Sequence, residues 1–204
     1  MGVHGTGGIQ SFTASAEFVI RAPRIADGRA VHTLIAACAP LDTNSLYLNL
    51  LQCTHFAGTC VLAEGTDQRS PVGFISGYLL PHRPATLFVW QVAIAASARG
   101  RGLASRMLLE LLDRPACGDV DHIETTITES NAASWALFRS LARKLCCPIE
   151  DRMLFDRNEH LDGVHESERL VRIGPFPPPS SAHVISRRHS RPPVDRGPKN
   201  PSQE

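Results

Sequence analysis

Apolar residues recur with two different periods along the middle of the chain, and the period separates strands from helices. Alternation by two, or an unbroken apolar run, predicts seven strands at residues 17–21, 59–64, 72–80, 86–94, 122–128, 153–155 and 169–173. Spacing by three and four predicts four helices, marked by Val31, Leu34 and Ile35, by Ser45–Leu51, by Leu103–Leu112, and by Trp135, Phe138, Leu141 and Leu145. The order β-α-α-β-β-β-α-β-α-β-β predicts an α/β domain around a mixed sheet.

Capping and breaking residues place the ends of these elements. Asp27 with Gly28 and Ser130 precede two of the helices and are predicted to cap them, and Asn44 or Ser45 begins another after Pro40. The run Leu87–Ile94 is apolar on both faces, which is typical of a central strand buried on both sides. The strand, helix and strand between residues 86 and 128 leave room for a right-handed parallel crossover.

The two ends of the chain differ from its middle. Residues 1–16 are rich in Gly, Ser, Thr and Ala without any period, and we expect a flexible lead. Residues 175–204 hold eight prolines and few apolar residues, so they cannot bury enough surface to offset the entropy lost on ordering. We therefore expect one folded domain at 17–174, followed by a disordered tail.

Composition excludes several function classes. The 204 residues carry 21 Lys and Arg against 20 Asp and Glu, so the net charge of +1 argues against a dedicated nucleic-acid binder. No apolar run approaches the roughly 18 residues that span a bilayer, and residues 1–17 lack the cationic and apolar regions of a secretory signal. We expect a cytoplasmic protein with neither nucleic acid nor membrane as partner.

The six cysteines do not predict a metal site. None forms a C-x-x-C pair, and Cys53, His55 and Cys60 lack the second spaced pair that zinc sites use. Buried thiols are the favoured interpretation, with no metal.

The most informative motif is Arg99-Gly100-Arg101-Gly102-Leu103-Ala104, which lies between the predicted central strand and an amphipathic helix. Glycines let the backbone approach a ligand closely, and the first N–H groups of a helix have no partner within the helix. With the helix dipole, these groups favour an anion such as a pyrophosphate. A plain helix start would also fit, but the P-loop and the dinucleotide-fold patterns are both absent.

This turn resembles the acyl-CoA signature of the GCN5-related N-acetyltransferases. Further motifs narrow the resemblance to the L-2,4-diaminobutyrate acetyltransferases, the enzymes of the acetylation step in ectoine biosynthesis. They span residues 17–176: Pro40–Tyr47, Leu50–Phe56, Leu87–Val92, Glu124–Thr126, Ser130–Ser134, Leu137–Phe138 and Arg172–Pro175. The resemblance implies a mostly antiparallel sheet of about seven strands with about four helices. It also implies transfer of an acetyl group from acetyl-CoA to the 4-amino group of L-2,4-diaminobutyrate.

The same resemblance implies where acetyl-CoA binds. Its pantetheine lies along the fourth strand, against backbone groups around Val92 and Ile94, and its pyrophosphate lies on the turn. The expected contacts of the pyrophosphate are Arg99, Arg101, Gly102, Leu103 and Ala104. Asn131 caps a helix near the cofactor. A homodimer suits this fold, although the chain shows no interface.

A substrate with two ammonium groups predicts acidic residues in its pocket. Glu124 is the candidate general base or ammonium anchor, and its alternative is a solvent-facing charge at a strand end. Asp42 either meets the substrate or caps a helix. Tyr47 and Trp90 either shape the pocket or serve as core aromatics, and His165 either reaches the substrate or lies on a surface loop.

One departure and two rivals stay open. Phe138 occupies the place where many members of the wider superfamily carry a tyrosine that protonates the leaving thiolate, so the general acid is unassigned. A thiol with a pKa near 8.5 leaves without strong acid assistance. The rivals are an N-acetyltransferase for other amines or for proteins, and a non-catalytic CoA-binding protein. A weaker hypothesis is that the five basic residues of the tail form an arm that binds nucleic acid.

Overall fold

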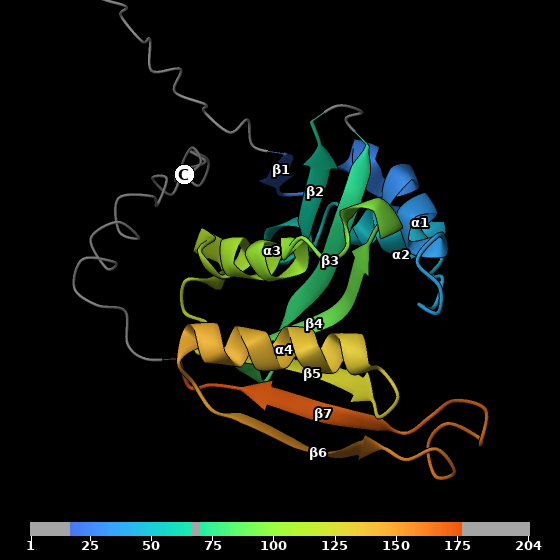
Figure 1. The fold of residues 1–204 in the computed structure, drawn as a ribbon, viewed down its shortest axis with the longest axis vertical. Coiled ribbons are helices and arrows are strands. Elements are labelled where there is room, and N and C mark those ends of the chain that lie inside the picture. The colour runs from blue at the N-terminus through green and yellow to red at the C-terminus, as the bar shows by residue number, and fades with distance from the viewer. Residues whose placement is uncertain (1–16, 67–69, 177–204) are drawn as a thin grey trace, which may run out of the picture.

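The computed structural model describes residues 17–66 and 70–176, which form a seven-stranded sheet covered by helices on both faces (Figure 1). The strands lie in the order β1-β2-β3-β4-β5-β7-β6, and every neighbouring pair is antiparallel except β4 with β5. Their bounds are Phe18–Arg21 (β1), Val61–Gly65 (β2), Pro71–Leu80 (β3), Arg83–Ile94 (β4), His122–Thr128 (β5), Ile149–Phe155 (β6) and Glu168–Ile173 (β7). The predicted mixed, mostly antiparallel sheet is confirmed.

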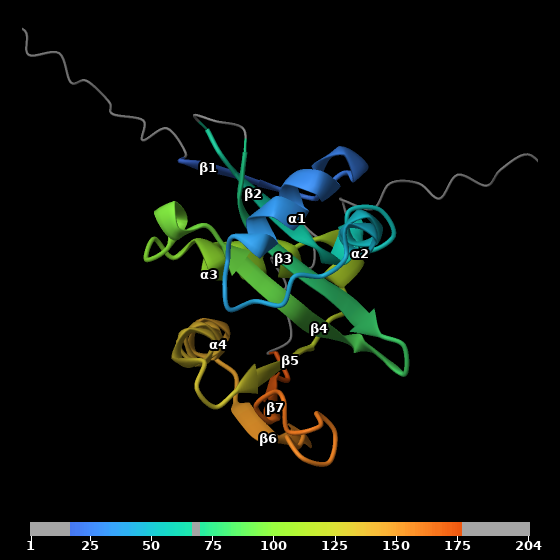
Figure 2. The ribbon, with the colours of Figure 1, turned by 90° about the vertical axis from the view of Figure 1, so that its right-hand side faces the viewer.

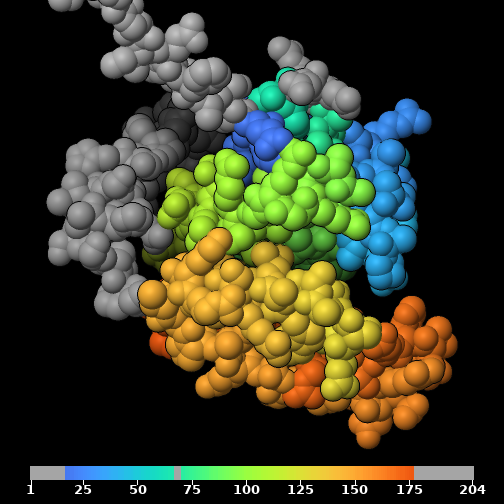
Figure 3. All heavy atoms as spheres, viewed as in Figure 1, coloured from blue at the N-terminus to red at the C-terminus, as the bar shows by residue number. Residues whose placement is uncertain are grey.

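Four helices divide between the two faces (Figure 2). They are α1 (Gly28–Ala36), α2 (Leu46–Gln52), α3 (Leu103–Leu112) and α4 (Ala132–Leu145). Successive strand residues point to opposite faces, so Leu62 and Phe74 pack with α1, whereas Val61 and Ile75 pack with α3 and α4. On the second face α3 and α4 lie side by side (Figure 3), and the Lys144 ammonium donates a hydrogen bond of 2.7 Å to the Ser105 hydroxyl.

A β-bulge interrupts β4 at Trp90. Ser76 and Gly77 of β3 pair with Gln91 and Val89, which leaves Trp90 without a partner across the ladder. The extra residue shifts the alternation of side chains along the strand. Leu87 and Val89 before the bulge, and Val92 and Ile94 after it, therefore all face α3 and α4.

The prediction that this strand is buried on both faces holds for only part of β4. Gln91 is buried and Ala93 packs with α1, but the side chain of Trp90 is 50% exposed. The prediction was wrong at Trp90 because α2 and the segment before it leave part of this face uncovered.

The strands β4 and β5 pair over three positions only. Their parallel ladder joins Thr86 to His122, Leu87 to Ile123 and Phe88 to Glu124. Beyond Phe88, β4 continues for six residues to Ile94 without β5 beside it. The two strands diverge there, and one edge of each is left without a ladder partner in the described sheet.

The helix caps agree with the sequence in part. Ser45 caps α2, since its hydroxyl accepts a hydrogen bond of 3.1 Å from the Leu48 N–H. Helix α4 is capped by Asn131, whose side chain accepts from the Ser134 N–H at 3.0 Å. The predicted cap at Asn131 is confirmed, whereas Ser130, the other residue predicted to cap this helix, instead donates its hydroxyl hydrogen to Glu166.

Asp27 stands at the N-cap position of α1 but bonds elsewhere. Its carboxylate accepts from the Arg21 guanidinium at 2.7 and 2.8 Å and from the Arg24 backbone N–H at 2.6 Å. Arg21 holds the pKa of Asp27 below its ordinary value by hydrogen bonding. Asp27 therefore joins β1 to the turn before α1 rather than capping the helix.

The folded part of the chain makes contacts beyond residue 174, the predicted end of the domain. The Phe176 N–H donates to the Asp121 carbonyl at 2.8 Å, and the Phe176 ring packs against the core of the α3 and α4 face. Strand β6 begins at Ile149, four residues before its predicted start. The predicted lead at 1–16 and most of the predicted tail lie outside the described residues. Within the described ranges, no helix has the length and apolar character needed to cross a membrane.

Candidate active site

A row of side chains crosses the sheet on the face that carries α1 and α2. The register aligns Tyr78 on β3 with Phe88 on β4, Glu124 on β5, and Arg172 on β7. Ile123 and Ile127 of β5 pack with α3 and α4, so Glu124 between them points to the opposite face. The rings of Tyr78 and Phe88 lie 5.3 Å apart. The row runs from an aromatic pair to a buried acid.

Glu124 is a buried carboxylate held by two arginines. Its side chain is 3% exposed, and both its oxygens accept hydrogen bonds from Arg83, at 2.6 and 2.8 Å. Arg172 donates to the same carboxylate from β7. Burial raises the pKa of Glu124, but the hydrogen bonds from Arg83 and Arg172 outweigh it and leave the pKa below its ordinary value. The alternative of a solvent-facing charge does not describe this residue.

Gln91 fixes the segment before α2 against β4. Its side-chain nitrogen donates to the Asp42 carbonyl at 2.9 Å, and its oxygen accepts from the Asn44 side chain at 3.1 Å. Gln91 is 8% exposed, so both bonds are shielded from water. The clamp brings Asp42 to the strand that carries Trp90, with the Asp42 side chain exposed.

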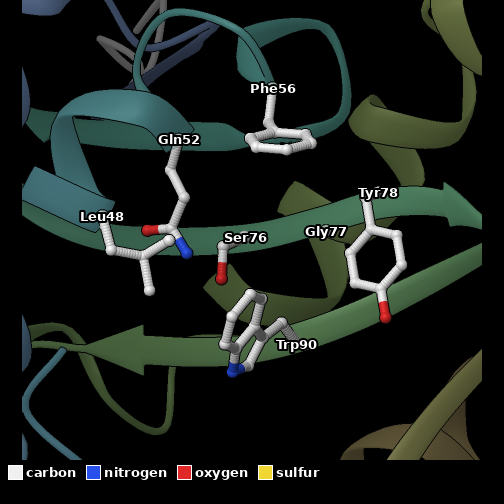
Figure 4. A pocket seen from close by; sticks show the side chains of 7 residues that line it. All are labelled: Leu48, Gln52, Phe56, Ser76, Gly77, Tyr78 and Trp90. Carbon is white, nitrogen blue, oxygen red and sulfur yellow. The ribbon is translucent and has the colours of Figure 1, made fainter.

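Trp90 and Tyr78 border a cavity between α2 and the β3–β4 hairpin (Figure 4). The two rings meet edge to face at 6.4 Å between centroids. Seven residues line the cavity: Leu48, Gln52, Phe56, Ser76, Gly77, Tyr78 and Trp90. Tyr47 lies in the first turn of α2 and is 70% exposed, so neither Tyr47 nor Trp90 is a core aromatic.

His165 lies apart from this group in the sequence and in the structure. It is exposed in the segment between β6 and β7. Within the described part of the chain, no hydrogen bond or ion pair joins His165 to Asp42, Tyr47 or Trp90. The structure therefore brings Asp42, Tyr47 and Trp90 to one region of the sheet face and leaves His165 on a loop.

The turn before α3 has the backbone that the glycines predict. Gly100 and Gly102 have φ of 74° and 70°, a left-handed conformation that side chains with a Cβ adopt rarely. A Cβ at either glycine would meet no heavy atom within 4 Å, so the space above the turn is open. Leu103 and Ala104 supply the first N–H groups of α3.

The two arginines of the turn have protein partners in this structure. Arg99 donates from Nε to the Ile94 carbonyl at 3.0 Å, and the Cys38 thiol donates to the same carbonyl at 3.4 Å. Arg101 forms an ion pair with Glu17, and its guanidinium lies 5.9 Å from the centre of the Phe18 ring. The Ile94 carbonyl is thus already engaged, while Val92 lies on the part of β4 that β5 leaves unpaired.

Two further observations concern the chemistry of the site. Phe138 of α4 is 2% exposed and packs into the core between α4 and the sheet. Within residues 17–66 and 70–176, no three His, Cys, Asp or Glu side chains come together as metal ligands.

Sequence reasoning missed Arg83, Arg172 and Gln91. Arg83 lies between the strands predicted at 72–80 and 86–94, although β4 begins there. Arg172 comes 48 residues after Glu124 in the sequence, and only the register of β5 with β7 places them together. A polar residue inside an otherwise apolar strand was the signal available for Gln91.

Comparison with known proteins agrees with this architecture. The acetyltransferase (GNAT) family model matches residues 29–142. An L-2,4-diaminobutyric acid acetyltransferase of Methylotuvimicrobium alcaliphilum is 51% identical over 164 residues, covering 80% of this chain and 94% of that protein. The enzyme of the same name from Chromohalobacter salexigens is 47% identical over 167 residues, covering 81% and 85%.

A solved structure extends the likeness to three dimensions. Diaminobutyrate acetyltransferase EctA from Paenibacillus lautus, in complex with its substrate L-2,4-diaminobutyric acid and coenzyme A, is similar with a TM-score of 0.76. It is 40% identical, and the match covers 82% of this chain and all of that one. This chain belongs to the acetyltransferase (GNAT) family and, within it, to the L-2,4-diaminobutyric acid acetyltransferases.

Proposed function

We propose that the chain transfers the acetyl group of acetyl-CoA to the 4-amino group of L-2,4-diaminobutyrate. The product is N4-acetyl-L-2,4-diaminobutyrate, the precursor of ectoine. The observation that carries this proposal is the match to the Paenibacillus lautus enzyme, which covers the whole of that chain and is 40% identical. We also propose that the enzyme acts in the cytoplasm as a homodimer, with neither nucleic acid nor membrane as partner.

The residues around the end of β4 fit acetyl-CoA. The thioester supplies an activated acetyl group and a thiolate leaving group. Gly102, Leu103 and Ala104 present the open turn and the free N–H groups of α3 to a pyrophosphate, as helix N-termini do. Val92 lies on the unpaired edge of β4, where main-chain groups are available to the pantetheine amides.

Two arginines of the turn have donors left for a phosphate in this proposal. Arg99 uses Nε for the Ile94 carbonyl and Arg101 uses Nη1 for Glu17, so each guanidinium keeps further N–H groups, and the exposed pair between Arg101 and Glu17 costs little to break. Asn131 caps α4 and holds its first turn, which serves the cofactor indirectly.

The acceptor site in this proposal lies on the sheet face that carries α1 and α2, between Trp90 on β4 and Glu124 on β5. Asp42, held by its carbonyl to Gln91, places a carboxylate where it attracts an ammonium group. Tyr47 and Trp90 offer exposed aromatic faces, which also favour a cation. His165 would reach the acceptor only from the loop between β6 and β7.

Glu124 suits the role of ammonium anchor better than that of a general base. A base near its operating pH is most effective, and the arginines hold the pKa of Glu124 on the acidic side. Arg83 is half exposed and can move aside for a substrate ammonium, whereas Arg172 remains with the acid. Water carries the amine proton away in this proposal.

The test is mass spectrometry of the product formed from acetyl-CoA and a panel of acceptors. The panel holds 2,4-diaminobutyrate, ornithine, lysine, spermidine and a lysine peptide, and fragmentation locates the acetyl group. We expect 2,4-diaminobutyrate to react fastest, at N4. A preference for another acceptor would keep the acetyltransferase and overturn the substrate. Acetyl-CoA binding without turnover would favour a regulatory CoA-binding protein instead.

A further inference from the structure

The cavity beneath α2 holds two polar atoms that lack partners. Its enclosed space is about 20 Å³, room for one water molecule or one ligand oxygen, and it opens to solvent past a rim formed by Phe56, Tyr78 and Trp90. Gln52 and Ser76 point their polar ends into it, toward the Trp90 ring (Figure 4). Gln52 Nε2 and Ser76 Oγ are buried, and neither has a hydrogen-bond partner.

Such atoms are unusual in a folded protein. Gln52 is 3% exposed and Ser76 is 1% exposed, so bulk water does not satisfy them. Leaving a buried donor unpaired costs free energy, and the great majority of buried polar groups therefore have a partner. Two such atoms at one cavity can be completed by a bound water or by an oxygen atom of a ligand that takes its place.

A chain of amides fixes the Gln52 nitrogen as the end that faces the cavity. His32 Nδ1 lies 2.9 Å from Asn49 Oδ1, and Asn49 Nδ2 donates to Gln52 Oε1 at 3.0 Å. Asn49 is fully buried, and both ends of its side-chain amide are used in these two hydrogen bonds. Gln52 Oε1 is thereby occupied as an acceptor, and Gln52 Nε2 remains as a donor aimed into the cavity.

The donors select the chemistry of the ligand. An amide N–H and a hydroxyl together suit an oxygen acceptor, and a carboxylate offers two such oxygens. The apolar rim suits the methylene carbons of a small molecule. An ammonium group would leave the Gln52 donor unpaired, so the amino ends of the acceptor belong elsewhere.

The sheet provides a direction for the rest of the molecule. Tyr78 borders the cavity and begins the row that leads across Phe88 to Glu124. Adjacent strands lie about 4.8 Å apart, so β3 and β5 are about 10 Å apart. An extended diamino acid, together with the side chains that bind its two ends, can span that distance. A carboxylate in the cavity thus directs the amino groups toward the acid.

We infer that Gln52 and Ser76 bind the carboxylate of the acceptor and select an amino acid over the corresponding diamine. This inference rests on the proposed function, because it takes 2,4-diaminobutyrate as the acceptor. The pair are binding residues, and the chain through Asn49 to His32 holds Gln52 in position.

The test compares two acceptors that differ only in the carboxylate, 2,4-diaminobutyrate and 1,3-diaminopropane. Gln52→Glu keeps the shape and the bond to Asn49 but replaces the donor by a charge that repels a carboxylate. Ser76→Ala removes the hydroxyl. We expect each change to raise KM for 2,4-diaminobutyrate about tenfold or more, the scale of a hydrogen bond to a charged group. We expect kcat/KM for 1,3-diaminopropane to stay within about twofold in Ser76→Ala and not to fall in Gln52→Glu, because the new carboxylate does not repel a diamine.

A matched control is Thr54→Ala, which removes a hydroxyl that bonds to the Leu50 and Leu51 carbonyls, away from the cavity. The KM for acetyl-CoA reports on the fold of each variant and should not change. Equal losses on both acceptors, or an unchanged KM for 2,4-diaminobutyrate, would overturn the inference alone. Wild-type enzyme that ignores 2,4-diaminobutyrate would overturn the proposed function, and this inference with it.

Discussion

Glu124 illustrates how a single buried charge is made tolerable. A carboxylate in a protein interior loses its hydration, and only close, hydrogen-bonded partners compensate. Arg83 and Arg172 supply them from both sides of β5, and they bring the pKa of Glu124 below its ordinary value. The ionised form is therefore the one that the fold stabilises.

This pairing has a measurable pH signature. A group whose pKa is lower in the folded state contributes stability above its unfolded pKa, near 4.3, and loses that contribution as pH falls through the folded value. We predict that Glu124→Gln lowers the free energy of unfolding by about 1–2 kcal/mol at pH 7, because Arg83 is half exposed and screened. Urea unfolding from pH 7 to pH 3 measures this. A difference between variant and wild type that did not shrink below pH 4 would contradict it.

The six cysteines separate into protected and accessible thiols. Cys38, Cys53, Cys60 and Cys117 are buried, as predicted, but Cys146 is exposed and Cys147 is half-buried. Burial raises the pKa of Cys53 to about 11 and that of Cys60 to about 12. Their thiolate fractions at neutral pH are therefore very small.

We predict that one thiol, Cys146, reacts rapidly with a disulfide reagent such as Ellman's reagent in the native protein. Cys147 should react more slowly, because burial also raises its pKa. The remaining four should react only after unfolding. Cys146→Ser should remove the rapid phase, and its persistence in that variant would show that another thiol is responsible.

Among the elements, the helices and most strands could be predicted because their apolar periods are regular. The bulge in β4 could not, since it depends on how Ser76 and Gly77 pair with Val89 and Gln91. An extra residue reverses the faces of the residues beyond it, and a strand with Gln91 as its one polar residue between Leu87 and Ile94 shows too little alternation to reveal that reversal. Ser130 and Asn131 are both good capping residues, and the sequence alone does not show which of the two caps α4.

The two neighbours at the start of α4 make a controlled comparison. Asn131→Ala should cost about 1 kcal/mol of stability, the usual value of an N-cap, since its side chain holds the Ser134 N–H. Ser130→Ala should cost less than about 0.5 kcal/mol, because its bond to Glu166 lies on the surface. Thermal unfolding of both variants measures the difference. Equal costs would argue that Ser130 shares the cap.

Gly102 carries a second test at the level of the element. Its φ of 70° places it in the left-handed region, and space for a Cβ is open, so backbone strain alone should determine the effect of a substitution. We predict that Gly102→Ala costs about 1–2 kcal/mol and raises KM for acetyl-CoA several-fold. Gly102→Asn should cost less, because Asn tolerates this region. Identical KM values for both variants and wild type would remove the turn from the cofactor site.

At the scale of the molecule, the α/β class and the mixed sheet followed from the order of elements. The active site followed only in part. Glu124 and Trp90 could be proposed from their places on strands, but the arginines of Glu124 come from β4 and β7. Contacts between distant segments depend on register, which a single sequence does not display. The segment around Asp42 reaches β4 through Gln91 for the same reason.

The boundary of the folded domain gives a prediction for the whole chain. A protein that ends at Phe176 should keep its activity and melt within about 2 °C of the full chain. One that ends at Gly174 should lose about 1–2 kcal/mol, because Phe176 no longer packs on the core or bonds to Asp121. Calorimetry of both truncations measures this. A large loss of stability in the protein that ends at Phe176 would show that residues 177–204 contribute to folding.

The divergence of β4 from β5 has a consequence for how the protein depends on its cell. In the proposed binding mode, acetyl-CoA lies where the sheet lacks a partner, and its amides substitute for those of a neighbouring strand. Every ligand molecule that binds the folded form and not the unfolded one adds to stability by mass action. The lifetime of this enzyme would then follow the supply of acetyl-CoA, so that a starved cell keeps less of it folded than a well-fed one.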